Sequence, residues 1–255
     1  MSHWYDKEGN PAYTIVGKNG KERNTTLADA KRLGLVPSVT TVMGCKADGY
    51  YLAKYKQDQL LEAAYNTPLL VDNTWGNWTR TVIKESRRHR EEAAQRGSEI
   101  HDALEHVYMT GKMSDELDAD TRDICQGVID FMESEFQGVK WIAEESFTSR
   151  FLGFGGRVDM HSKHDNIVLD FKTKGKDDLS MVKAYDDHHM QTAAYAVGLG
   201  LDAPESKRYN LFVSTTTPGE LKLTESTNFT REWGMFDALL DYWHLSNNYD
   251  LSVLR

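Results

Sequence analysis

The sequence predicts an α/β fold in which a central, mostly mixed β-sheet is flanked by helices and preceded by an N-terminal helical elaboration. Helical periodicity dominates up to about residue 136. Three strand-like segments then follow one another, and a helix, a hairpin and a closing helix complete the chain. This order is typical of a sheet covered by helices. We expect an elaboration over residues 1–95 and a core over residues 96–255.

The N-terminal part is expected to begin with a β-hairpin over residues 4–24, because residues 17–20 form a strong turn signal. Thr25 or Thr26 can cap a short helix that ends at Gly34. Residues 37–43 are consistent with a short strand or with the start of a helix. Two longer helices are expected over residues 48–66 and 77–95, separated by an aromatic-rich break at residues 73–78.

The core part is expected to open with a helix that Ser98 caps and Gly111 closes. A second amphipathic helix follows over residues 116–136. Beyond these helices, the pattern predicts strands over 141–149, 151–160 and 167–172, a helix over about 179–200, a hairpin of strands 209–215 and 221–224, and a helix over 230–247.

The bulk composition limits the class of protein. The chain has 255 residues and a net charge of −9, which argues against a protein that coats DNA non-specifically. No run of apolar residues is long enough to cross a membrane, and no secretory signal is apparent, so we expect a cytoplasmic protein. Cys45 and Cys125 are the two cysteines, too few for a four-thiolate zinc or iron–sulfur site.

Residues 153–172 carry the strongest chemical signal. Asp159 and Asp170 each end a short strand-like run, and Lys172 lies two residues beyond Asp170, on the same face of a strand. Gly155 and Gly156 precede the first aspartate and allow close backbone approach. Two carboxylates and a lysine that converge at strand ends can bind a divalent metal ion and support hydrolysis of a phosphodiester bond.

Together with three further motifs, this stretch resembles the PD-(D/E)xK nuclease superfamily, and within it the RecB-type exonuclease branch, which includes phage exonucleases and the mitochondrial genome-maintenance exonuclease. The resemblance covers about residues 37–215. The motifs that carry it are G-x-x-x-H-x-x-x-E over Gly97–Glu105, the glycine-then-acid motif over Gly155–Asp159, acid-x-Lys over Asp170–Lys172, Q-x-x-x-Y over Gln191–Tyr195, and an N-terminal signature over Pro37–Val42.

The resemblance implies a restriction-endonuclease-like core and a DNA exonuclease that depends on Mg²⁺ or Mn²⁺. The chain departs from branch members that carry an iron–sulfur cluster, because those members use four cysteines. It also lacks a G-x-x-x-x-G-K-[ST] loop, so we expect a stand-alone nuclease rather than part of a helicase polypeptide.

The same resemblance assigns roles to individual residues. The expected metal ligands are His101, Asp159, Asp170 and the backbone carbonyl of Phe171, with Glu105 and Glu145 as weaker candidates. Because neighbouring strand residues face opposite sides, only one of Glu144 and Glu145 can face the site, and we favour Glu145.

Three further residues are expected to act in catalysis beside the two aspartates. Lys172 would position the attacking water or neutralise developing negative charge. Gln191 would hydrogen-bond near Lys172 or to the DNA backbone, and Tyr195 would contact phosphate or orient the site. A second set is expected to contact DNA: Arg157, Thr173, Lys174, Lys176, Arg87 and Arg88.

Two alternatives remain open beside the exonuclease. One is a structure-specific endonuclease, and the other is a catalytically silent DNA-binding module on the same fold. In each case the expected partner is DNA, single- or double-stranded, and for the exonuclease it is a DNA end. A phage recombination or single-strand-binding protein is a candidate partner in the host cytoplasm, and no membrane is expected to be involved.

Overall fold

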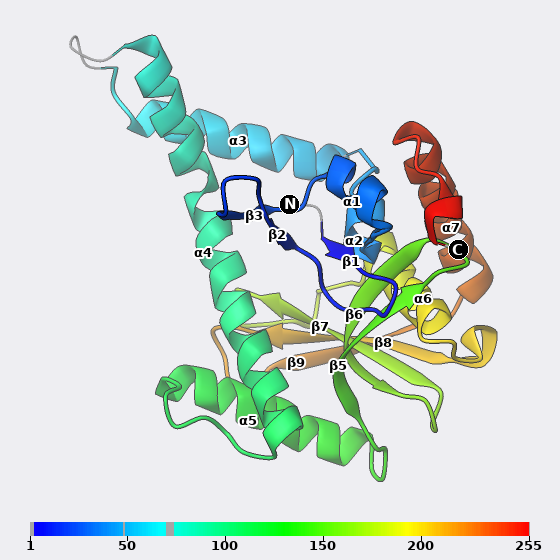
Figure 1. Cartoon of the computed structure of the whole chain (residues 1–255). Helices are drawn as coiled ribbons and strands as arrows, with labels where there is room; N and C mark the ends of the chain where they lie inside the picture. Colours follow the sequence, from blue (N-terminus) through cyan, green and yellow to red (C-terminus); the bar gives the residue numbers. More distant parts are fainter. Residues whose placement is uncertain (1–2, 48, 70–73, 255) are drawn as a thin grey trace.

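A computed structural model describes residues 3–47, 49–69 and 74–254 of the chain (Figure 1). Within these residues it contains a five-stranded mixed sheet, two small two-stranded sheets and seven α-helices, which confirms the expected α/β class. The first residue of the expected 48–66 helix and residue 73 of the expected aromatic-rich break lie outside the described residues.

The large sheet has the strand order β5-β6-β7-β8-β9. Strands β7 and β8 run parallel, and every other neighbouring pair is antiparallel. The parallel pair requires a crossover, which helix α6 provides. The bounds are β5 Ile142–Ser149, β6 Phe154–Ser162, β7 Ile167–Lys174, α6 Asp186–Gly198, η1 Ala203–Glu205, β8 Lys207–Ser214 and β9 Leu221–Ser226.

Helices cover both faces of this sheet (Figure 1). Helices α4 (Trp75–Thr110) and α5 (Ala119–Glu135) pack on one face through a cluster that includes Leu104, Leu169 and Phe171. Helices α6 and α7 (Phe229–Ser246) pack on the other face, around Phe154 and Val158. A short 3₁₀ turn, η2, covers Leu251–Leu254.

The N-terminal segment joins the second layer. Strands β2 (Thr14–Val16) and β3 (Glu22–Asn24) form the expected hairpin, but β1 (Trp4–Tyr5) lies outside it and pairs with β4 (Val36–Pro37). Helix α1 covers Leu27–Leu33 with Thr26 as its cap, and α2 covers Val39–Met43. Residues 36–43 therefore form a short strand and then a short helix.

Helix α4 is longer than the sequence predicts. It runs without interruption from Trp75 to Thr110, so the expected division between residues 95 and 96 falls inside it. The expectation that Ser98 caps a new helix is wrong, because the Ser98 hydroxyl donates to the Ala94 carbonyl one turn earlier, at 3.1 Å. The cap is Thr74 instead.

Two helices form an arm at the N-terminal end of α4. The outer half of α4 projects beyond the sheet and packs against α3 (Tyr50–Asn66) (Figure 1). On the opposite side of the sheet, α6 begins at Asp186, later than the expected residue 179. Among the described residues, no helix has the length and apolar character needed to cross a membrane.

Candidate functional site

The expected metal ligand Asp159 lies where strands β6 and β7 separate. The two strands pair through residues 160–162 and 167–169. Beyond that point the Asp159 side chain bridges them, since its Oδ2 accepts a hydrogen bond from the backbone N–H of Phe171 at 2.7 Å. The carboxylate of Asp159 is thus fixed next to Asp170, which repels it electrostatically.

A glycine allows helix α4 to reach this point. A Cβ atom on Gly97 would lie 2.6 Å from the Thr173 hydroxyl at the end of β7, so any other residue would require either the Thr173 side chain or the helix to shift. One turn further along α4, His101 extends toward the sheet, and its Nδ1 lies 3.6 Å from Asp159 Oδ2. The close approach at Gly97 therefore explains the four-residue spacing between this glycine and the histidine.

The second aspartate and the lysine lie on the side of β7 that faces α6. The Asp170 side chain is only 2% exposed, and Lys172 Nζ lies 2.6 Å from its Oδ2. Asn210 on β8 donates to the same oxygen at 3.1 Å. Lys172 also donates to Gln191 Oε1 at 2.9 Å, which is the expected contact, and Gln191 Nε2 donates to the Tyr195 hydroxyl at 2.7 Å.

The site carries more buried negative charge than its cations compensate. Burial, and then repulsion from Asp170, raise the pKa of Asp159 to about 6, against the opposing effects of His101 and Lys172. Burial and the charge of Asp159 raise the pKa of Glu144 to about 8. Burial and the two aspartates also hold the pKa of Tyr195 well above its ordinary value. A bound cation would relieve all three effects.

Arg157 links two glutamates near Asp159, one on helix α4 and one on strand β5. Its guanidinium forms short ion pairs with Glu105 on α4 and with Glu144 on β5. The sequence predicts that Arg157 contacts DNA and that Glu105 supports the metal. In the structure these two side chains form an ion pair with each other. Contact of Arg157 with DNA, or of Glu105 with a metal ion, would therefore require this ion pair to break.

Glu144, rather than Glu145, is the glutamate on the site side of β5. The register of β5 and β6 places Glu144 level with Asp159, and its backbone adopts a left-handed conformation with φ of 55°. Glu145 points the other way, where it contacts His161 Nε2 at 2.7 Å and accepts from Lys163 at 2.9 Å. The expectation that Glu145 faces the site is therefore wrong, and Glu144 faces it instead.

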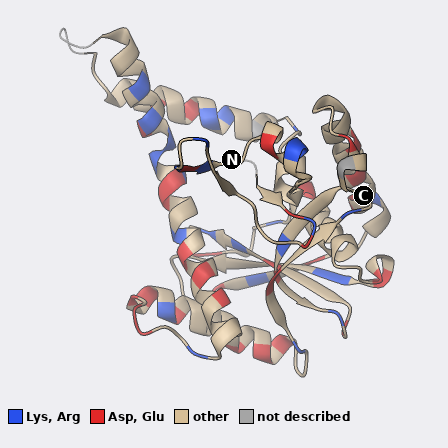
Figure 2. Ribbon diagram, viewed as in Figure 1, with Lys and Arg blue, Asp and Glu red and all other residues tan. Residues whose placement is uncertain are grey.

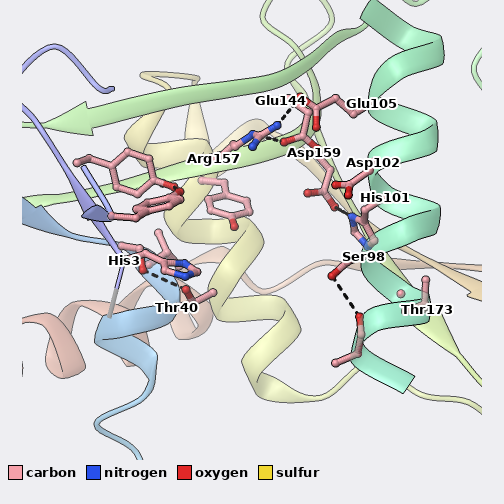
Figure 3. Close-up of a pocket in the computed structure, with 18 residues that line it drawn as sticks. His3, Thr40, Ser98, His101, Asp102, Glu105, Glu144, Arg157, Asp159 and Thr173 are labelled. Carbon is pink, nitrogen blue, oxygen red and sulfur yellow. Dashed lines mark hydrogen bonds and ion pairs between the residues drawn. The ribbon is translucent and has the colours of Figure 1, made fainter. Parts of the chain in front are cut away.

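A cavity of about 610 Å³ opens beside these groups (Figure 3). One wall is formed by α4 and the neighbouring strands, with His101, Glu144 and Asp159. In Figure 3, His3 and Thr40 lie across the cavity from His101 on α4. The complete lining comprises His3, Tyr5, Tyr13, Ser38, Val39, Thr40, Ala94, Gly97, Ser98, His101, Asp102, Glu105, Glu144, Gly156, Arg157, Asp159, Thr173 and Tyr195.

The residues expected to contact DNA are spread over two regions. Thr173 lines the cavity, Lys176 is exposed nearby, and Lys174 lies over the Phe212 ring, where burial lowers its pKa. Arg87 and Arg88 lie on the arm, about 20 Å along α4 from the site at 1.5 Å per residue. Figure 2 shows that basic residues gather on this outer half of α4, whereas acidic residues dominate its inner half and α5.

The donor set suits a hard divalent cation. Among the described residues, no three His, Cys, Asp or Glu side chains already converge into a closed metal site. Nevertheless His101 lies 3.6 Å from Asp159, and Asp170 is close enough to raise the pKa of Asp159, so carboxylate oxygens and one imidazole nitrogen are available in the same part of the site. That chemistry fits Mg²⁺ or Mn²⁺, with the histidine favouring Mn²⁺.

Three features of the site were not anticipated from the sequence. Asn210 has no recognisable motif around it, although its position on β8 opposite Asp170 follows from the parallel pairing. Glu144 depends on an irregular backbone conformation. The far wall of the cavity comes from residues 3–13 and 38–40, which lie far from the acidic residues in sequence; the Pro37–Val42 signature was the one available signal.

Comparison with known proteins leaves the family of the chain open. No family model matches the sequence, and no curated protein matches it. Among solved structures, one similar chain is described as "Crystal structure of SSO0001", with 15% sequence identity and a TM-score of 0.31. The similarity covers 76% of this chain and 87% of that one.

Proposed function

We propose that this protein is a metal-dependent DNA exonuclease that hydrolyses phosphodiester bonds, using Mg²⁺ or Mn²⁺. The observation that carries the proposal is the pair of adjacent aspartates, Asp159 and Asp170, with an imidazole on one side and an ammonium on the other. Both the residue types and their order along the chain match the RecB-type branch of the PD-(D/E)xK nucleases.

Asp159, Asp170 and His101 would hold the metal, together with the carbonyl of Phe171. The metal would supply Lewis-acid activation of water and of the scissile phosphate. The carboxylate of Asp159 is already oriented by the Phe171 N–H, so little reorganisation is needed to present it.

Lys172 would position the attacking water and neutralise charge that develops on the phosphate. Its ammonium is held by Asp170 and by Gln191, and Gln191 is fixed in turn by the Tyr195 hydroxyl. This chain of contacts holds the ammonium beside Asp170, on the side of β7 that faces α6, and a phosphate bound between the two aspartates would meet it there.

An assay with labelled DNA tests this proposal against the endonuclease and the silent module. An exonuclease shortens linear DNA from an end in the presence of Mg²⁺ or Mn²⁺ and leaves a covalently closed single-stranded circle intact. Cleavage of the circle would support an endonuclease instead. DNA binding with no metal-dependent product after long incubation would support the silent module.

A further inference from the structure

The wall of the cavity opposite α4 contains a preformed aromatic stack that the proposed chemistry does not use. The rings of His3 and Tyr13 are stacked, with centroids 4.5 Å apart and planes 25° apart, and both rings line the cavity. Tyr5 meets Tyr13 edge-on at 5.7 Å, and the two hydroxyls are 2.7 Å apart. Because Tyr5 is only 3% exposed, it fixes the orientation of Tyr13.

The other half of the stack is fixed by the segment after β4. The backbone N–H of His3 donates to Thr41 Oγ1 at 3.0 Å, and the Ser38 N–H donates to the His3 carbonyl at 2.9 Å. Ser38 Oγ in turn caps α2 by accepting from the Thr41 N–H at 3.0 Å. The Pro37–Val42 signature therefore holds the His3 backbone in place, while His3 as a whole residue remains exposed.

The two walls of the cavity match the two halves of a nucleotide. The wall with Asp159 and His101 suits a phosphate that binds through a metal ion, whereas the opposite wall offers aromatic rings and the Thr40 hydroxyl. The volume of about 610 Å³ lies within the range of small-ligand sites. Aromatic rings stack on any nucleobase, but the base has to be unpaired and unstacked from its neighbours.

We propose that the His3–Tyr13 stack is a binding subsite for one unpaired nucleobase of the strand whose phosphodiester bond lies at Asp159. The inference rests on the proposed nuclease function and adds its substrate class. The strand in the site is single-stranded or frayed, and its base is accepted without regard to sequence, because stacking reads no base edge.

Binding of labelled single-stranded DNA tests the subsite separately from catalysis. Fluorescence anisotropy is measured with Ca²⁺ in place of Mg²⁺, for wild type, His3→Ala, Tyr13→Phe and the control Tyr242→Ala on the exposed side of α7. His3→Ala should weaken binding by about 5- to 100-fold, the cost of losing one stacked base. Tyr13→Phe keeps the ring and should bind within about twofold of wild type, as should the control.

Oligonucleotides with one abasic position locate the base. In wild type, removal of the base at one particular position should weaken binding most, and in His3→Ala that same removal should cost almost nothing further. Equal binding by His3→Ala and wild type, or the same abasic penalties in both proteins, would overturn the subsite. If wild type cleaves DNA but shows no abasic position whose penalty is lost in His3→Ala, the subsite is rejected and the nuclease function stands. If that penalty is seen but no metal-dependent cleavage occurs, the subsite is supported and the proposed nuclease function is rejected.

Discussion

Replacement of Asp159 by asparagine should stabilise the metal-free protein above neutral pH while it removes nuclease activity. The Asp159 side chain is 16% exposed, and burial together with Asp170 raises its pKa from 3.8 to about 6. Asparagine keeps an oxygen that can accept from the Phe171 N–H, but it carries no charge. The substitution therefore removes the electrostatic cost of the site and keeps its hydrogen bond.

The magnitude follows from the pKa of Asp159. A rise to about 6 disfavours the ionised carboxylate in the folded state by about 3 kcal/mol. Relaxation of the metal-free site and entry of water should reduce this to about 1–2 kcal/mol. Because the pKa is raised on folding, wild type loses this stability as pH rises from about 4, where the unfolded carboxyl ionises, through about 6. The gain from asparagine is thus small at about pH 4 and complete above about pH 7.

Urea unfolding in EDTA, followed by circular dichroism at about pH 4 and pH 8, measures this difference. A gain of 1–2 kcal/mol at the higher pH should raise the Tm by roughly 2–8 °C. Asp102→Asn, an exposed carboxylate on the same cavity wall, is the matched control and should change little. A variant of Asp159 that is less stable than wild type at pH 8, or equally stabilised at both values, would refute the electrostatic account.

Two other contacts make separate predictions. Gly97→Ala places a methyl group 2.6 Å from the Thr173 hydroxyl and should destabilise the fold by about 1–3 kcal/mol in thermal or urea unfolding. Adding Thr173→Ala removes the clash and should recover the stability; failure of the double variant to recover it would show that the packing of α4 does not depend on this contact. Glu232→Ala removes the carboxylate that pairs with the buried guanidinium of Arg208, which is 2% exposed and lies 3.1 Å from Glu232. The variant should lose about 3–5 kcal/mol of stability in thermal or urea unfolding without altering the site, because the charge of Arg208 stays buried without its counter-ion. A loss below about 1 kcal/mol would contradict this account of the ion pair.

Local signals were sufficient for most of the large sheet. The strands around Asp159 and Asp170 carry apolar runs bounded by turns, and the pairing of β8 with β9 follows from a short turn at residues 218–219. The Q-x-x-x-Y spacing also predicts correctly that Gln191 and Tyr195 share one face of α6, where they hydrogen-bond to each other.

The errors arise where tertiary packing overrides a local signal. Gly97 and Ser98 resemble the start of a helix, but the glycine is needed for contact with Thr173, and the serine hydroxyl bonds back into the preceding turn. Alternation along β5 cannot reveal which glutamate faces the site, because Glu144 adopts a left-handed conformation. The contact of His3 with the cavity spans about a hundred residues of sequence and has no local signature.

Metal-dependent cleavage by wild type and by Lys172→Ala tests the central claim most directly. The measurement uses single- and double-stranded DNA labelled at either end, with Mg²⁺, Mn²⁺ or EDTA, after circular dichroism has confirmed that the variant is folded. We predict progressive shortening by wild type with either metal, none in EDTA, and a loss of at least about a hundredfold in Lys172→Ala. Full metal-dependent activity in Lys172→Ala, or no shortening by wild type, would contradict the proposed function.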